Sequence, residues 1–216
     1  MGLPPGQRVA EHVPFGLPEF AVRPEVPDRP AVTVTGLVRR PTQLAAAELA
    51  GLAGRVELRA GLHCVTTWSA PDLCWSGVPF AAVHAFLAER VGVRGARWVT
   101  FGGLDGYRST LALEDALAPG VLLADRLAGA GLDRDTGAPM RLVAPAHYGY
   151  KNVKHVCLIE YRRDYDAGPA GWKGHPRGRV AREERSRFLP GRMWRPVWRA
   201  LLPRARAVYE AGRARD

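Results

Sequence analysis

The sequence predicts an α+β domain built on a mixed β-sheet, with few and short helices. Segments with strand character are numerous and short, and they do not alternate with helices as a doubly wound fold requires. The 216 residues include 24 glycines and 18 prolines, so turns are frequent and long helices are not expected to dominate. With 47% hydrophobic and 24% charged residues, the composition is typical of a soluble globular protein.

Three parts are predicted: an extended arm over residues 1–30, a main domain over residues 31–165, and a basic C-terminal extension over residues 166–216. Seven prolines interrupt the arm, so it can be ordered only by lying on the rest of the protein. His12, Phe15 and Phe20 are its expected anchors, through packing and not through chemistry.

The elements of the main domain follow from periodicity and turn residues. Strands are predicted over residues 31–40, 55–58, 96–101, 109–113, 121–127, 141–145 and 156–161. Helices are predicted over residues 44–52, 79–92 and 113–117. Between the strand 55–58 and the helix at 79 lies the segment GLHCVTTWS (61–69), and we expect a loop and a Gly-Val-Pro turn (77–79) after it.

The cysteines and the N-terminal residues bear on location. Cys64, Cys74 and Cys157 are odd in number and irregularly spaced, which argues against a disulfide framework. The first thirty residues contain neither an apolar signal core nor an arginine pair, and no apolar run approaches the ~20 residues that span a bilayer. A cytoplasmic location without a transmembrane segment is therefore expected.

The positive charge is concentrated in one part of the chain. Residues 162–216 hold 15 Lys+Arg against 6 Asp+Glu, a net charge of +9, whereas residues 1–161 hold 16 against 15. Three hypotheses for this extension stay open: a structural arm, a surface that docks on a membrane or a redox partner, and a nucleic-acid binder. Nucleic acid is the least favoured, because no known reader fold is present. The prolines at 176, 190, 196 and 203 are expected to break any long helix.

Most catalytic motifs are absent. The sequence has no P-loop, GxGxxG fingerprint, nucleophile elbow, HExxH or haem-attachment motif in a suitable context. Three features remain: the thiol of Cys64 on a predicted exposed loop, Arg141 after the turn DTGAP, and the basic glycine loop HYGYKNVK with Lys154. A buried, purely structural Cys64 is the alternative, since most free cysteines are of that kind.

Several separated motifs carry a family resemblance. HCVTTWS, WSGVPF, GYRSTLALEDAL, LLADRL, TGAPMRLVAP and HYGYKNVKHVCLIEY occur in the order seen in the molybdopterin-binding domain of the sulfite oxidase family. The resemblance covers roughly residues 31–165. Around the cysteine, the sequence is more similar to the bacterial methionine sulfoxide reductase catalytic subunit and its short soluble relatives than to sulfite oxidase.

The resemblance implies a mixed-sheet fold and a mononuclear molybdenum held by molybdopterin and one protein thiolate. Cys64 falls on that thiolate, and a soft sulfur ligand suits such a metal. Arg141 falls on a family arginine that binds the cofactor. The segment of Asn152, Val153 and Lys154 falls where the family chain wraps the cofactor.

Two positions depart from the pattern of the reductase. His63 stands where the reductase has an arginine, and it either contacts the pterin, tunes the thiolate or is structural. Thr136 stands where the reductase has a cofactor-binding asparagine.

These features predict a molybdopterin-dependent oxidoreductase that transfers an oxygen atom. Residues 65–77 contain no Arg or Lys, and about fifty residues are too few for the family's dimerisation domain, so sulfite is not the expected substrate. A small neutral S- or N-oxide is expected instead. No haem, flavin or cluster motif is visible, so electrons are expected to come from an external partner. The alternative is a non-catalytic module that carries the cofactor or binds a partner through its basic tail.

Overall fold

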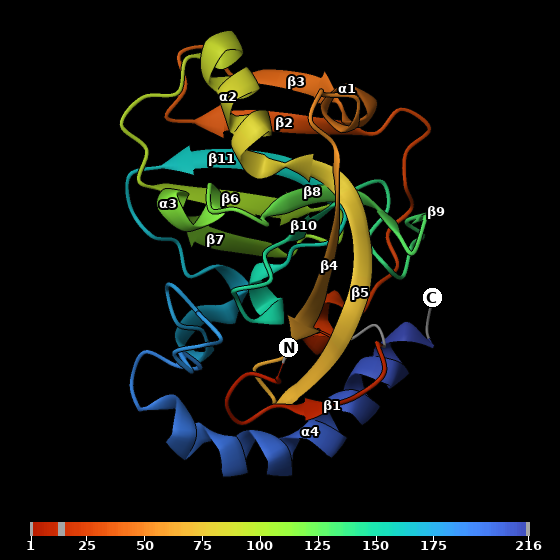
Figure 1. The fold of residues 1–216 in the computed structure, drawn as a ribbon, viewed down its shortest axis with the longest axis vertical. Helices are drawn as coiled ribbons and strands as arrows, with labels where there is room; N and C mark the ends of the chain where they lie inside the picture. Colours follow the sequence, from red (N-terminus) through yellow and green to blue (C-terminus); the bar gives the residue numbers. More distant parts are fainter. Residues whose placement is uncertain (1, 13–15, 215–216) are drawn as a thin grey trace.

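The computed structural model describes residues 2–12 and 16–214 and contains two mixed sheets with few helices, which confirms the predicted fold class (Figure 1). The strands are β1 (Arg8–Val9), β2 (Ala31–Gly36), β3 (Thr42–Ala45), β4 (Val56–His63), β5 (Trp68–Pro79), β6 (Trp98–Gly103), β7 (Arg108–Ala112), β8 (Leu122–Leu127), β9 (Ala130–Gly131), β10 (Arg141–Val143) and β11 (Val156–Arg162). The α-helices are α1 (Ala46–Ala50), α2 (Phe80–Val91), α3 (Leu113–Ala116) and α4 (Gly191–Arg213). The 3-10 turns are η1 (Pro18–Phe20), η2 (Gly149–Lys151) and η3 (Gly168–Lys173).

The five-stranded sheet has the order β3-β2-β11-β6-β7. Strands β2 and β11 are parallel, and the other neighbours are antiparallel. Helix α2 buries Phe80, Val83, Leu87 and Val91, which recur at helical spacing and join side chains of both sheets in the main core.

The six-stranded sheet has the order β1-β5-β8-β10, with β4 paired to β5 and β9 paired to β8. Alternate residues of its strands point to opposite faces. Leu123 and Leu142 join the main core, whereas Leu122 and Val143 join a second cluster around the fully buried Trp75. The sheet therefore has apolar packing on both faces.

Strand β5 is the largest departure from the sequence-based expectation. The predicted loop and turn after residue 69 are wrong, because Trp68–Pro79 is one long strand, drawn as the curved arrow in Figure 1. Pro71 and Asp72 lie where the β4–β5 register shifts, and Asp72 has a φ of 56°, so the proline occupies a bulge. Gly77 is needed for close packing and not for a turn, since a Cβ there would stand 2.2 Å from the carbonyl oxygen of Leu123.

The helix predicted over residues 44–52 is only partly correct. Leu44 and Ala45 belong to β3, where they pair with β2, and α1 begins at Ala46. The helix predicted over residues 79–92 is confirmed by α2, with Gly92 as a left-handed C-cap.

Helix α4 contradicts the expectation that prolines break any long helix in the extension. It runs from Gly191 to Arg213 through Pro196 and Pro203, and both prolines are exposed. An interior proline costs about 3 kcal/mol in an isolated helix. Here the opposite face of α4 packs on the protein and buries Tyr209 to 2% exposure, and that packing offsets the cost.

Two ion pairs hold α4 near its ends. Arg195 binds both carboxylate oxygens of Glu183, at 2.7 and 2.6 Å, and Arg213 binds Asp135 at 2.6 Å. None of the described helices is long and apolar enough to cross a bilayer.

The N-terminal arm lies on the domain as a short strand and a turn. Strand β1 pairs in parallel with the start of β5, and η1 packs against α4. Of the predicted anchors, His12 lies 6.2 Å from Trp75 and Phe20 lies 5.2 Å from Tyr107 (ring centroids). Phe15 lies outside the described residues.

Candidate functional site

Cys64 opens the tight turn that joins β4 to β5. Its N–H donates to the carbonyl of Trp68 at 2.8 Å, and its own carbonyl accepts from the N–H of Thr67 at 3.1 Å. Thr67 has a φ of 78°, a left-handed conformation that a β-branched residue rarely adopts. Such a conformation persists only where the surroundings impose it, so this turn is held by other segments.

The first of those segments is the N-terminal arm. Gln7 donates from Nε2 to the carbonyl of Cys64 at 3.1 Å and accepts at Oε1 from the hydroxyl of Ser69 at 3.1 Å. The Ser69 oxygen lies 2.8 Å from Nδ1 of His63, which leaves His63 Nδ1–H as the donor. The chain from His63 through Ser69 to Gln7 thus fixes both sides of the turn.

The second segment is the C-terminal extension. Arg185 is fully buried and donates to the carbonyls of Val65 at 2.5 Å and Pro5 at 3.3 Å. Its guanidinium carbon lies 5.0 Å from the centre of the Tyr148 ring, a cation–π contact. One side chain therefore ties the Cys64 turn to both ends of the described chain.

Cys64 is half-buried and not exposed as the predicted loop suggests, and this burial raises the pKa of the thiol. The hydroxyl of Thr66, 3.0 Å from the sulfur, and the positive charges of Arg185 and Arg206 act in the opposite direction. An unliganded Cys64 is therefore a protonated thiol at neutral pH, next to groups that stabilise a thiolate.

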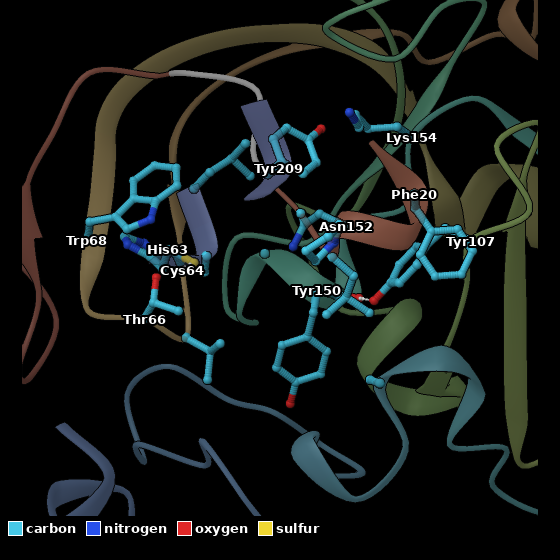
Figure 2. A pocket seen from close by; sticks show the side chains of 18 of the residues that line it. Phe20, His63, Cys64, Thr66, Trp68, Tyr107, Tyr150, Asn152, Lys154 and Tyr209 are labelled. Carbon is cyan, nitrogen blue, oxygen red and sulfur yellow. Dashed lines mark hydrogen bonds between the residues drawn. The ribbon is translucent and has the colours of Figure 1, made fainter. Parts of the chain in front are cut away.

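Cys64 opens into a cavity of about 600 Å³. Figure 2 shows His63, Cys64, Thr66 and Trp68 together on one side, which we call the thiol end, with Lys154 on the far side. Arg141 also lines the cavity, and we call the region of Arg141 and Lys154 the cationic end. From α4, the lining side chains are Trp194, Trp198, Leu201, Arg204, Ala205, Val208 and Tyr209.

The cationic end holds one buried cation, Arg141, and one half-buried cation, Lys154, and neither has a full set of partners. Arg141 is 4% exposed and donates to the carbonyl of Thr136 at 2.8 Å, while its Nε has no hydrogen-bond partner among the described residues. Burial lowers the pKa of Arg141 to about 10, and burial with the charge of Arg141 lowers the pKa of Lys154 to about 8. Lys154 likewise has no hydrogen bond to the described part of the chain.

Gly137 lies between these two cations. A Cβ at this position would stand 3.1 Å from the Cβ of Arg141 and 3.2 Å from that of Lys154, and its φ is 119°. Glycine at this position lets the stems of Arg141 and Lys154 pack close to the same point of the backbone, and two neighbouring cations suit an anion.

The other predicted cofactor residues lie around this end in different roles. Asn152 lines the cavity, but its carboxamide accepts from the N–H of Ala144 at 2.6 Å and donates to the carbonyl of Tyr148 at 3.2 Å. The side chain of Val153 lies in the main core, and that of Thr136 bonds to the carboxylate of Asp133 at 2.8 Å. These three residues shape the loops that carry Arg141 and Lys154.

Burial lowers the pKa of both histidines that line the cavity. His63 lies at the thiol end, where its Nδ1 is occupied by Ser69. The pKa of His12 falls to about 4, through burial and the charges of Arg141 and Lys154. Both imidazoles are therefore neutral at pH 7.

Sequence reasoning missed several residues of this site. Trp194, Trp198 and Tyr209 share one side of α4 and recur at near-helical spacing, a signal that the prolines obscured. Arg185 and Gln7 carry no local signal, because their partners are far away in the sequence.

Among the described residues, no three His, Cys, Asp or Glu side chains gather as a metal-binding group. A metal at Cys64 would therefore need most of its ligands from a bound cofactor.

The chain matches known proteins over most of its length. A family model described as oxidoreductase molybdopterin-binding domain matches residues 20–170. The chain is 33% identical over 136 residues to the uncharacterized oxidoreductase YuiH of Bacillus subtilis. That match covers 62% of this chain and 66% of the relative.

A second relative is the protein-methionine-sulfoxide reductase catalytic subunit MsrP of Xanthomonas campestris. The identity is 32% over 146 residues, and the match covers 61% of this chain but only 44% of the relative. Among solved structures, the sulfane dehydrogenase SoxCD from Paracoccus pantotrophus matches with a TM-score of 0.59 at 20% identity. It covers 72% of this chain and 45% of that one. The last match supports the fold alone.

Proposed function

The chain belongs to the family of oxidoreductases with a molybdopterin-binding domain, which confirms the resemblance found in the sequence, and we propose that it transfers an oxygen atom to or from a small substrate. The matches cover only part of the curated relatives, 66% of one and 44% of another. Activity, substrate and partners are therefore proposals for this chain. A small S- or N-oxide is the proposed substrate, and an external carrier is the proposed source of electrons.

The residues of the cavity fit the molybdenum cofactor. Cys64 supplies a soft sulfur at one end, and a cofactor with a phosphate tail needs cationic donors at the other. Arg141, with its unpaired Nε, and Lys154 are such donors, and Gly137 lets their stems pack close together. Cys64 would bind the metal and Arg141 and Lys154 would hold the phosphate. When bound, the cofactor supplies the redox and oxygen-atom chemistry that no side chain provides.

The chain's own residues position the thiolate and shield it. Gln7 and Arg185 hold the turn of Cys64 by donating hydrogen bonds to the carbonyls of Cys64 and Val65. The hydroxyl of Thr66 can donate to the sulfur. Trp194 and Trp198 of α4 form an apolar wall that limits access of water. His63 is neutral and bonded through Nδ1, so it is a positioning residue in this proposal.

The nature of the wall favours an uncharged substrate. Leu62, Val65 and Trp68 line the thiol end, and the cations of the opposite end are assigned to the cofactor. One observation favours a second candidate, an anionic substrate. Arg204 of α4 also lines the cavity, so the extension supplies a positive charge there, whereas residues 65–77 supply none.

The test uses protein expressed in a host that makes molybdopterin. Molybdenum content and reduction of a small sulfoxide by a reduced dye are measured in the wild type and in Arg204→Gln. The neutral substrate is supported if the wild type holds about one molybdenum per chain and reduces the sulfoxide, and if Arg204→Gln leaves that turnover unchanged. Sulfite turnover lost in Arg204→Gln supports the anionic substrate. Bound molybdenum without turnover of the sulfoxide or of sulfite would support the alternative, a non-catalytic carrier of the cofactor.

We propose the cytoplasm as the location, on the evidence of three cysteines that form no disulfide. A compartment-specific reporter fused to the chain tests it, and a signal confined to an oxidising compartment would contradict it.

A further inference from the structure

The outer side of α4 and the loop before it expose large apolar side chains. Phe188, Leu189, Met193 and Val197 are 59%, 47%, 55% and 42% exposed. Met193 and Val197 are four residues apart, so they lie on one flank of the helix. This cluster is exposed, whereas the inner face of α4 packs on the protein.

Some arginines of the extension pair with carboxylates, and others do not. Arg177, Arg179, Arg185, Arg195 and Arg213 are each paired with a carboxylate. Arg187, Arg192 and Arg199 form no ion pair with any described residue, and all three are exposed. The unpaired arginines are interspersed with the apolar cluster, and the guanidinium of Arg187 lies 4.8 Å from the centre of the Phe188 ring.

Acidic groups are scarce on this surface. Within α4 the only carboxylate is Glu210, in the last turn and more than three turns beyond Met193. A surface with unpaired arginines, protruding apolar side chains and no acid complements a layer of anionic phosphates above hydrocarbon.

We propose that this surface, formed by Arg187, Phe188, Leu189, Arg192, Met193, Val197 and Arg199, docks on a lipid bilayer that carries anionic headgroups. The arginines bind headgroup phosphates, and the apolar side chains enter the boundary between headgroups and acyl chains. In Figure 1, α4 runs along the lower edge of the molecule with β1 beside it, so the helix is open to a flat partner. The inference does not depend on the reaction proposed above.

Docking would also orient the cavity. Met193, Val197, Leu201 and Val208 recur at intervals of four, four and seven residues, so they share a flank of α4. Leu201 and Val208 line the cavity and are 48% and 47% exposed. The docked helix therefore turns the α4 side of the cavity opening towards the bilayer.

Vesicle flotation of the full chain tests the proposal. Vesicles of phosphatidylcholine with about 30% phosphatidylglycerol are compared with pure phosphatidylcholine at about 0.1 M salt. Wild-type protein is expected to bind the anionic vesicles at least about tenfold more strongly. Arg187→Gln/Arg192→Gln is expected to lose about tenfold or more, since each arginine near an anionic surface contributes about 1 kcal/mol.

A second double variant, Met193→Ser/Val197→Ser, is expected to lose about tenfold through the apolar contact. The matched control is Val56→Ser/Arg94→Gln, which changes an exposed apolar residue and an exposed unpaired arginine far from α4. It should bind like the wild type. If the wild type does not bind anionic vesicles, the proposal is overturned, and an acidic protein becomes the candidate partner of this surface. An equal loss in the control variant would overturn it as well.

Discussion

The two ends of the cavity are built in different ways. Gln7, Cys64 and Arg185 meet at the thiol end, although Gln7 and Arg185 are nearly 180 residues apart in the chain. At the cationic end, Gly137, Arg141 and Lys154 come from one stretch of fewer than twenty residues. The thiol end depends on the whole fold, whereas the cationic end depends on the start of β10 and the two loops beside it.

This difference bears on how each end responds to change. Removal of a distant support should disturb the thiol end together with global stability. Removal of a cation should weaken anion binding and leave the fold almost intact.

Cys64→Ser tests the thiol end most directly and should have the largest effect. Loss of the soft ligand is expected to lower molybdenum retention by roughly 100-fold or more. Metal content per chain, measured by mass spectrometry, is the readout. Cys74→Ser, a half-buried cysteine of β5, serves as the control. Equal metal content in wild type and Cys64→Ser would remove Cys64 from the site.

Arg185→Ala asks whether the thiol end depends on the extension. Two carbonyls lose their donor and a buried space opens, so the free energy of unfolding should fall by about 2–4 kcal/mol. Urea unfolding measures it, against Arg182→Ala, which removes an exposed arginine. If both variants unfold at the wild-type midpoint, Arg185 is not a support of the turn.

Arg141→Met separates the cationic end from the fold. A charge-assisted hydrogen bond contributes about 1.5–3 kcal/mol, so pterin retained per chain should fall by about tenfold or more. The pterin is measured by fluorescence after denaturation. The exposed Arg126→Met is the control, and unfolding should change little in either variant. If Arg141→Met loses much stability but keeps its normal pterin content, Arg141 supports the fold and does not hold the cofactor.

Lys154 is expected to have the smallest effect of these positions, and its effect on anion binding should depend on pH. Its pKa of about 8 lies below its usual value of 10.5, because burial and Arg141 disfavour the charged form. The ammonium is present below about pH 8 and lost above it, so cofactor-free protein should bind sulfate several-fold more weakly at about pH 9 than at about pH 7. Sulfate keeps its charge over this range.

Calorimetric titration with sulfate provides the measurement, and Lys154→Met should bind weakly with little pH dependence. A wild-type affinity that stays constant through this range would show that Lys154 does not contact the anion.

The local end of the cavity is also the more predictable one. TGAPMR and YGYKNVK place Arg141 and Lys154 close together in the sequence. Arg141 begins β10, as the predicted strand 141–145 does, and Lys154 lies in the predicted glycine loop, just after η2. Their roles toward the cofactor stay predictions, as do those of His63, Thr136, Asn152 and Val153.

The rest of the site depends on tertiary contacts that a linear pattern does not contain. Pro71 and Gly77 suggested turns, yet a bulge and a close strand approach accommodate them inside β5. Pro196 and Pro203 suggested a broken helix, yet burial of the opposite face keeps α4 continuous. In both regions packing outweighed local preference, and the wall over Cys64 was missed as a result.

The position of α4 links cofactor loading to quality control of the protein. Seven side chains of α4 line the cavity, so a molecule bound in the cavity contacts the helix and stabilises its packing on the protein. In turn, the packed helix stabilises the bound molecule. By this linkage, a chain that has not received its cofactor is expected to hold this helix less firmly and to expose Trp194 and Trp198 more often. Proteases and chaperones that survey apolar segments would then remove empty chains and spare loaded ones.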